Sequence, residues 1–292
     1  MPEICLVLGG SGFLGREAVP ALARSFKVVA TSMRPRGDGS RVVDLRDADA
    51  TMRLVEDVRP RYVVLLAAYR DPDFCEEYPG EAARLNVDPA RTLVQCLSPD
   101  VRFLFVSTDY VFDGEHPPYI ETSKRNPLSV YGRTKMAAED IVMSRPGSLV
   151  VRVPLLMGWT DDPKASGFFS QLVADVTSSV PVVLDDALAR YPVWTRDMGE
   201  AMRVLLERDQ EGVFHYSTTR RLTRYQAALE MAKLMARPAS HITPSREVVV
   251  RKAMRPRDAQ LSIDRWRALG FPPPRDFCDV AREFLGVYRQ AI

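Results

Sequence analysis

The sequence predicts an α/β protein built on a Rossmann-type, doubly wound parallel sheet. Three observations support this prediction. Apolar segments of strand length alternate with segments of helical periodicity through the first half of the 292 residues. A glycine-rich turn follows the first apolar segment directly. The composition, 46% hydrophobic and 27% charged, is that of an ordinary globular chain, which buries enough surface to fold without disulfides.

The predicted strands of the first half are short and almost wholly apolar, as strands buried on both faces of a sheet are. They span residues 4–8, 27–30, 62–67, 101–106 and 149–153. Strands and helices that alternate in this way form right-handed βαβ units and a parallel sheet. The intervening helices are predicted at residues 14–25, 47–58, 80–97 and 129–143, with Pro89 bending or dividing the third.

After Pro154 the alternation becomes irregular, which indicates a smaller mixed α/β region and not a second Rossmann half. Helices are predicted at 167–176, 197–208 and 223–235, strands at 182–184 and 212–216, and a last helix after the proline-rich loop 271–274. We expect a cofactor-binding domain over residues 1–154 and a substrate-binding region over residues 155–292, with exchange of chain between the two. The second region should cover the carboxyl edge of the sheet, where ligands bind in such folds.

Charge and composition exclude several classes of function. The net charge is only +2, whereas binding to nucleic acid or to an anionic membrane requires a basic surplus on one face. No apolar run approaches the ~18 residues of a membrane span, and the first strand has Glu3 and no basic leader before it. Four cysteines without metal-ligand spacing favour a reduced, cytoplasmic protein with no bound metal.

The glycine turn between the first strand and the first helix predicts a dinucleotide site. Gly9, Gly12 and Gly15 form a GxxGxxG pattern, which permits a tight turn and close approach of the backbone to a pyrophosphate. The free N–H groups at the start of the helix then face the anion. We expect the cofactor to contact Gly9, Ser11, Gly12, Phe13, Leu14 and Gly15.

The end of the second strand favours NADP(H) over NAD(H). An acidic residue about 20 residues beyond the glycines would hold a ribose 2′-hydroxyl, and residues 31–36 contain none. Arg34 can instead pair with a 2′-phosphate and Ser32 can donate to it, with Met33 between them. Further cofactor contacts are expected where other strands end, at Asp44, Leu45, Ala67, Ala68 and Tyr69.

Tyr131 and Lys135 form a YxxxK pattern on a predicted helix, where a spacing of four places both side chains on one face. The lysine ammonium favours the phenolate, so the tyrosine can exchange a proton with a carbonyl or alcohol oxygen. A compact ammonium suits this position better than a guanidinium, although only six of the 40 cations are lysines. The hydroxyls of Ser107 and Thr108 end the fourth predicted strand and can bind the same oxygen.

Several motifs resemble those of the extended short-chain dehydrogenases/reductases, in particular the dTDP-4-dehydrorhamnose reductase group. Residues 107–114 resemble its STDYVFDG motif, residues 127–135 its PLNxYGKTK motif and residues 255–261 its RPxxxxL loop. The resemblance implies a catalytic triad of Thr108, Tyr131 and Lys135. It further implies a supporting amide at Asn86, and we expect cofactor contacts at Asn86, Ser107, Tyr131, Lys135, Val153 and Pro154. Asp109 and Tyr110, beside the Thr108 hydroxyl, are candidate substrate contacts. Trp159 either lines the substrate pocket or packs the smaller region, and Arg255 either receives an anionic substrate or belongs to a solvated basic face.

A second resemblance, within the same group, leaves two functions open. Residues 152–158 are similar to the RIPILYG run of the regulatory beta subunits of methionine adenosyltransferase, which bind NADP and a partner enzyme. The sugar reductases have a serine-tryptophan-valine-tyrosine run where this chain has residues 154–157. The sequence therefore predicts either a reductase of a sugar nucleotide or other small polar metabolite, or a cofactor-binding regulatory protein. The family implies a homodimer or docking to a partner enzyme.

Overall fold

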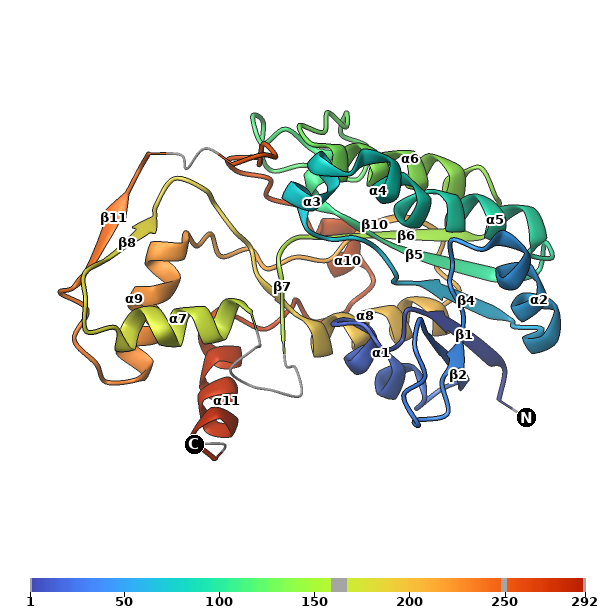
Figure 1. Ribbon diagram of the computed structural model, residues 1–292, viewed down its shortest axis with the longest axis horizontal. Coiled ribbons are helices and arrows are strands. Elements are labelled where there is room, and N and C mark those ends of the chain that lie inside the picture. The colour runs from blue at the N-terminus through green and yellow to red at the C-terminus, as the bar shows by residue number, and fades with distance from the viewer. Residues whose placement is uncertain (1, 159–166, 248–250, 291–292) are drawn as a thin grey trace.

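A seven-stranded parallel sheet lies at the centre of the computed structural model, which describes residues 2–158, 167–247 and 251–290. The strand order is β10–β6–β5–β4–β1–β2–β3, and all six pairings are parallel (Figure 1). This arrangement confirms the predicted fold class. The strands are β1 (Ile4–Leu8), β2 (Lys27–Ser32), β3 (Arg41–Val42), β4 (Tyr62–Leu65), β5 (Arg102–Thr108), β6 (Ser148–Val153) and β10 (Gly212–His215).

The central strands are apolar along most of their length because each of their faces packs into a separate core. In β1, Cys5 and Val7 belong to one core cluster, whereas Leu6 and Leu8 belong to the cluster on the opposite face. Successive side chains of a strand point to opposite faces, so a strand covered on both sides has few polar positions. The same alternation continues through β5 and β6.

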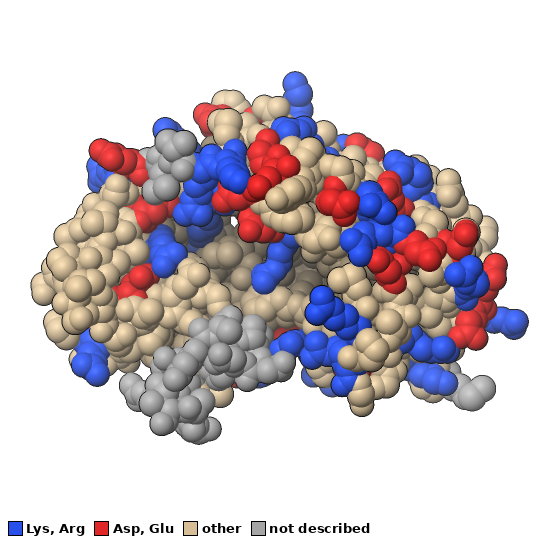
Figure 2. Space-filling view, in the orientation of Figure 1, with Lys and Arg blue, Asp and Glu red and all other residues tan. Residues whose placement is uncertain are grey.

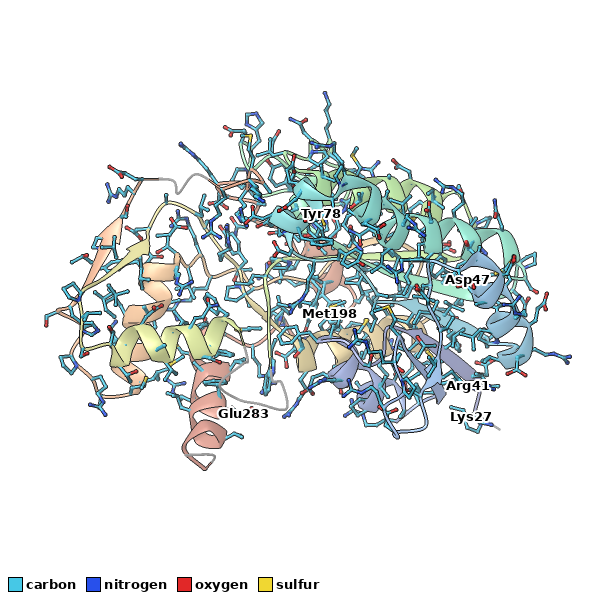
Figure 3. The ribbon with its side chains drawn as sticks, viewed as in Figure 1. Lys27, Arg41, Asp47, Tyr78, Met198 and Glu283 are labelled. Carbon is cyan, nitrogen blue, oxygen red and sulfur yellow. The ribbon has the colours of Figure 1, made fainter. Side chains whose placement is uncertain are left out.

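Helices cover both faces of the sheet (Figure 1). On one face lie α1 (Gly15–Leu22) and α8 (Thr195–Glu207), and on the other lie α2 (Ala48–Val58), α4 (Pro79–Asn86), α5 (Asp88–Cys96) and α6 (Val130–Met143). The Asp47 carboxylate accepts from the Ala50 N–H at 2.9 Å and starts α2 (Figure 3). The predicted helix at 80–97 is divided at Val87, immediately before Asp88-Pro89 at the start of α5.

A smaller lobe stands beside the carboxyl ends of the strands (Figure 1). Its core joins α7 (Phe168–Thr177), β8 (Val182–Asp185), α9 (Arg224–Leu234), β11 (Ile242–Ser245) and α11 (Phe277–Gln290). The short elements α3 (Pro72–Glu77), β7 (Leu156–Met157), β9 (Val193–Trp194), α10 (Asp264–Ala268), β3 and β11 were not predicted, because few residues show too little periodicity. No helix within the described ranges is long and apolar enough to cross a membrane.

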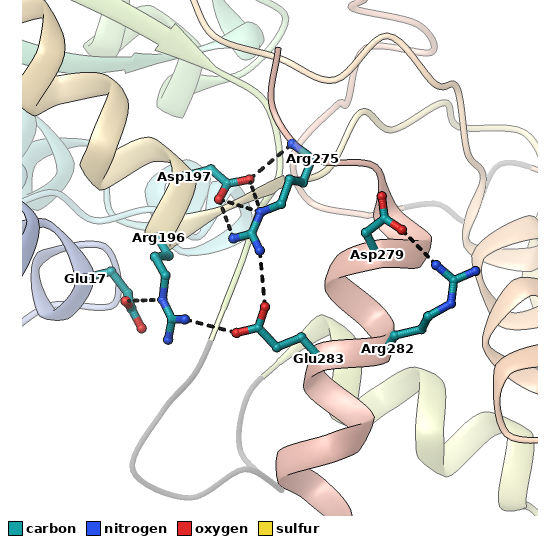
Figure 4. A network of polar contacts seen from close by, with 7 residues as sticks. All are labelled: Glu17, Arg196, Asp197, Arg275, Asp279, Arg282 and Glu283. Atoms are coloured by element: carbon teal, nitrogen blue, oxygen red, sulfur yellow. Dashed lines mark hydrogen bonds and ion pairs between the residues drawn. The ribbon is translucent and has the colours of Figure 1, made fainter. Parts of the chain in front are cut away.

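An ion-pair network connects α11 of the smaller lobe to α1 and α8 (Figure 4). Arg196 contacts Glu17 at 3.3 Å and Glu283 at 3.0 Å, and Arg275 contacts the same Glu283 at 3.2 Å. Arg275 also binds Asp197, and both guanidinium groups lie over the Trp194 ring, at 4.6 and 4.2 Å from its centroid. Because the arginines of these pairs are 42–47% exposed, each pair contributes little, and the network adds to the packing of α11 in the core of the smaller lobe.

The contact between α1 and α8 provides a test of this packing. A Cβ on Gly199 would lie 2.9 Å from the Glu17 carbonyl oxygen, whereas one on Gly286 of α11 would meet nothing within 4 Å. Gly286→Ala should raise the free energy of unfolding by about 0.5–1 kcal/mol through helix propensity. Gly199→Ala gains the same propensity but should lose a net ~1–3 kcal/mol because α8 must move. Urea denaturation measures both, and equal changes in the two variants would contradict this packing.

Candidate active site

A cavity of about 510 Å³ opens between the sheet and the smaller lobe, at the carboxyl ends of the central strands. Figure 2 shows this hollow near the middle of the molecule, with Lys and Arg side chains around it. Parallel sheets place the ends of their strands at one edge, so residues distant in sequence converge there. Its walls include most of the positions predicted from the sequence: Gly9, Ser11, Gly12, Phe13, Leu14, Gly15, Ser32, Met33, Asp44, Leu45, Ala67, Ala68, Ser107, Thr108, Asp109, Tyr110, Tyr131, Lys135, Val153 and Pro154.

The glycine turn forms one end of the cavity and has no room for side chains. Gly9 has a φ of 92°, its N–H donates to the Thr31 hydroxyl at 3.0 Å, and a Cβ there would lie 2.8 Å from the Ala67 nitrogen. A Cβ on Gly15 would lie 2.6 Å from the Gly10 carbonyl carbon. These contacts hold the start of α1 against the cavity, where its free N–H groups can bind a pyrophosphate.

The Ser107 hydroxyl supports a nicotinamide dinucleotide as the occupant of this cavity. It is 2% exposed, lines the cavity and has no hydrogen-bond partner among the described residues. Buried hydroxyls are almost always paired, so a bound molecule is expected to supply the partner. Asp44 also lines the cavity, and Arg46 binds it bidentately and holds the pKa of its carboxyl below the usual range. The glycine turn, the orphaned hydroxyl and the apolar walls fit the parts of such a cofactor.

Thr108 and Tyr131 meet at the far end of the cavity because α6 packs closely on the turn that follows β5. A Cβ on Gly132 would lie 2.9 Å from the Pro127 side chain and 3.1 Å from the Tyr110 carbonyl carbon, so only glycine fits there. The Tyr131 ring stands edge-on to the Tyr110 ring at 5.6 Å. Burial raises the pKa of Tyr131 above its ordinary value, although a hydrogen bond with Thr108 opposes this. Without a cofactor, burial therefore outweighs the expected effect of the lysine on this phenol.

Lys135 lies one helical turn beyond Tyr131 and is 3% exposed. Its ammonium lies 3.9 Å from the centroid of the Phe105 ring, a cation–π contact in place of an ion pair. Burial lowers the pKa of this ammonium to about 7, and the Glu139 carboxylate acts in the opposite direction. The protonation of Lys135 therefore depends on what occupies the cavity beside it.

A buried polar network supports α6 from behind. Arg152 of β6 binds Glu139 with its Nε at 3.0 Å and its Nη2 at 2.8 Å, and Arg125 adds a bond at 3.0 Å. The Nη1 of Arg152 lies 3.2 Å from Nε2 of His215, and Nδ1 of the same ring lies 3.2 Å from the Ser262 carbonyl oxygen. Burial and the Arg152 charge lower the pKa of His215 to about 3, so this histidine is neutral.

Four predicted site residues, Arg34, Tyr69, Asn86 and Arg255, do not lie on the walls of the cavity. Asn86 is buried behind it, where its side chain bonds both the N–H and the carbonyl of Tyr69 and the Thr134 hydroxyl. Arg34 is exposed, and its carbonyl accepts from the Ser32 hydroxyl. Arg255 pairs with Asp73 at 2.9 Å. A further predicted substrate contact, Trp159, lies outside the described residues.

Several residues of the cavity wall carry no local sequence pattern that predicts them. Arg190 arises from the segment between β8 and β9, and Arg70 follows β4 and stacks over the Phe13 ring at 4.8 Å. Neither belongs to a recognisable motif, and their places depend on how the smaller lobe and the loops fold. The other unpredicted lining residues are Thr31, Val43, Leu66, Pro72, Leu85, Val106, Leu155 and Leu156.

Comparison with known proteins identifies the family. The sequence model of the RmlD substrate binding domain family matches residues 3–289. The chain belongs to this family. It is thus one of the extended short-chain dehydrogenases/reductases, a group of NAD(P)-dependent oxidoreductases, as its motifs predicted.

Individual relatives carry two kinds of name. Methionine adenosyltransferase 2 subunit beta of Bos taurus is 32% identical over 273 residues, which cover 91% of this chain and 82% of that protein. A probable dTDP-4,6-dihydroxy-2-methyloxan-3-one 4-ketoreductase of Streptomyces antibioticus is 32% identical over 286 residues, 95% of this chain and 93% of the other. The dTDP-4-dehydrorhamnose reductase of Bacillus anthracis, solved in complex with NADP, shares the fold with a TM-score of 0.87 at 21% identity, covering 98% and 99% of the two chains.

The neutral, buried His215 predicts a loss of stability in acid. Its folded-state pKa of about 3 lies below the ordinary 6.5, so its contribution is complete above pH 6.5 and is lost as the pH falls toward 3. The free energy of unfolding should fall by up to ~1.4 kcal/mol per pH unit in this window from this residue alone. His215→Asn should remove that part of the slope, whereas His116→Asn, at an exposed histidine, should retain it. Identical slopes in both variants would refute the assignment.

Proposed function

We propose that the protein is an NADP(H)-dependent reductase that acts on a carbonyl group of a sugar nucleotide or another small polar metabolite. One observation carries this proposal: Thr108, Tyr131 and Lys135 line the same cavity as the glycine turn. A shared cavity of this kind suits a dinucleotide whose pyrophosphate lies at the turn and whose nicotinamide lies near the tyrosine. The Streptomyces antibioticus relative, named as a ketoreductase of a dTDP sugar, supports the substrate class.

The side chains have separate tasks in this proposal. Burial keeps Tyr131 protonated at neutral pH, so its phenol can donate a proton to the carbonyl oxygen. When bound, the nicotinamide supplies the hydride that the carbonyl carbon receives, and the product is an alcohol. Thr108 orients the carbonyl oxygen. Lys135 holds the ribose hydroxyls, and its positive charge compensates the phenolate left on Tyr131.

The preference for NADP(H) rests on the end of β2. Ser32 and Met33 line the cavity there, and residues 31–36 have no carboxylate to hold a ribose 2′-hydroxyl or repel a phosphate. The nearby Arg46 is engaged by Asp44 at 2.6 Å, whereas Arg34 makes no ion pair within the described part of the chain. Arg34 is therefore the cation available to a 2′-phosphate.

Titration of intrinsic fluorescence with each cofactor tests this preference. Wild type should bind NADPH more tightly than NADH. Arg34→Ala should weaken NADPH binding about tenfold or more, the value of a charge-assisted hydrogen bond, and leave NADH binding unchanged. Arg36→Ala, two residues further along the loop, is the matched control. Tighter binding of NADH to wild type would exclude the proposed preference.

The catalytic assignment is tested by NADPH oxidation in the presence of a panel of keto sugars and sugar nucleotides. Tyr131→Phe should lower kcat about 10²–10⁴-fold, because it removes the proton donor without changing the ring. Lys135→Arg should lower turnover about 10²-fold through misplacement of the charge, while circular dichroism shows an intact fold. Full activity of either variant would remove that residue from the proposed triad.

A second candidate function is regulatory docking on another enzyme. The 32% identity to methionine adenosyltransferase 2 subunit beta, over 82% of that protein, favours it. The substrate panel separates the two functions. Absence of turnover with every carbonyl tested, together with a stoichiometric complex with a methionine adenosyltransferase catalytic subunit in a pull-down, would favour docking over reduction.

A further inference from the structure

Asp109 is a buried carboxyl group in the wall of the cavity that the proposed chemistry leaves without a task. It is 7% exposed and follows Thr108 directly at the end of β5. The Thr108 hydroxyl donates to its Oδ1 at 3.1 Å. The charged and titratable groups that act on this carboxyl or line the same cavity are Arg190 from the smaller lobe, Tyr110 in the same turn, and Tyr131 and Lys135 of α6, together with Arg70 and Asp44.

The hydrogen bonds that the Thr108 hydroxyl can make depend on whether the Asp109 carboxyl is ionised. A hydroxyl group has one hydrogen and two lone pairs. The Thr108 hydrogen goes to the Asp109 carboxylate, and one lone pair accepts from the Tyr110 N–H at 3.2 Å. Once the Tyr131 phenol, which otherwise hydrogen-bonds Thr108, donates to the substrate, the Thr108 hydroxyl can only accept one more hydrogen bond and has no hydrogen for a carbonyl oxygen. If Asp109 is protonated, it can donate to the second lone pair, and the Thr108 hydrogen becomes available to the substrate.

Building on the proposed reductase function, we propose that Asp109 is a positioning residue whose protonation decides whether Thr108 can donate a hydrogen bond to the substrate carbonyl. The ionised carboxylate retains the Thr108 hydrogen, and the carboxylic acid releases it. Carbonyl reduction should therefore be fastest when Asp109 is protonated, because two donors, Thr108 and Tyr131, then stabilise the developing alkoxide.

The groups around Asp109 place its change between carboxylic acid and carboxylate near physiological pH. Burial raises the pKa of Asp109 to about 6, and the Arg190 guanidinium, which faces it from the smaller lobe, acts in the opposite direction. A substrate that excludes water from the cavity would raise the pKa further. The contribution of the Thr108 donor is therefore present below this pKa and is lost as the pH rises through it.

The test is the pH dependence of kcat/KM for carbonyl reduction with saturating NADPH. Wild type should lose activity as the pH rises through the Asp109 pKa. Asp109→Asn cannot ionise and should show no such limb. Arg190→Gln removes the opposing cation and should move the midpoint to higher pH. The control Arg133→Gln, at an exposed arginine on α6 outside the cavity, should leave the midpoint unchanged.

In the kinetic test, two outcomes would overturn the inference: the same pH-dependent loss of kcat/KM in Asp109→Asn, or an unmoved midpoint in Arg190→Gln. The second variant keeps the test decisive if the first does not fold. Absence of turnover in wild type would count against the reductase itself, and a direct measurement then tests the inference. Carbon-13 NMR of the Asp109 carboxyl should show a higher pKa in Thr108→Val than in wild type, because the variant loses the donor to the ionised form. An unchanged pKa would overturn it.

Discussion

The close approach of α6 to the turn after β5 is the constraint on which the site depends. Residue 132 has no room for a Cβ between the Pro127 side chain and the backbone of Tyr110. Only at this distance does the first turn of α6 bring Tyr131 beside Thr108, and the helical repeat then buries Lys135 against Phe105. The network of Arg152 and Glu139 supports the helix from its other side. The packing of the α6 backbone on the turn after β5 therefore determines where the side chains of the site lie.

The parts of the fold that the sequence predicts are those with a strong periodic signal. The mostly apolar strands β1, β4, β5 and β6 follow from burial on two faces, and the glycine turn is fixed by the space around Gly9 and Gly15. YxxxK and the strand-end hydroxyls are local patterns too, and the structure brings them to one cavity. The family resemblance adds the order in which these patterns occur along the chain.

The residues that the sequence does not predict are placed by long-range packing. Arg190 reaches the cavity only because the smaller lobe folds over the sheet, and no local pattern distinguishes it from other arginines. Arg255, expected at the substrate, pairs with Asp73 of α3, a helix too short for its periodicity to be recognised. Asn86 supports the wall through Tyr69 and Thr134. A charge count gives the number of arginines but cannot say which carboxylate each one meets.

The return of the chain to the sheet at β10 has a consequence for synthesis on the ribosome. The edge strand β10 pairs with β6 but is synthesised about 60 residues later, after α7, β8 and α8. Until His215 has left the exit tunnel, the backbone N–H and C=O groups along the outer edge of β6 have no partner, and an open edge invites pairing with another chain. The N-terminal half therefore cannot complete its sheet ahead of the rest. A nascent chain of this architecture is expected to need protection by chaperones until most of its length has emerged.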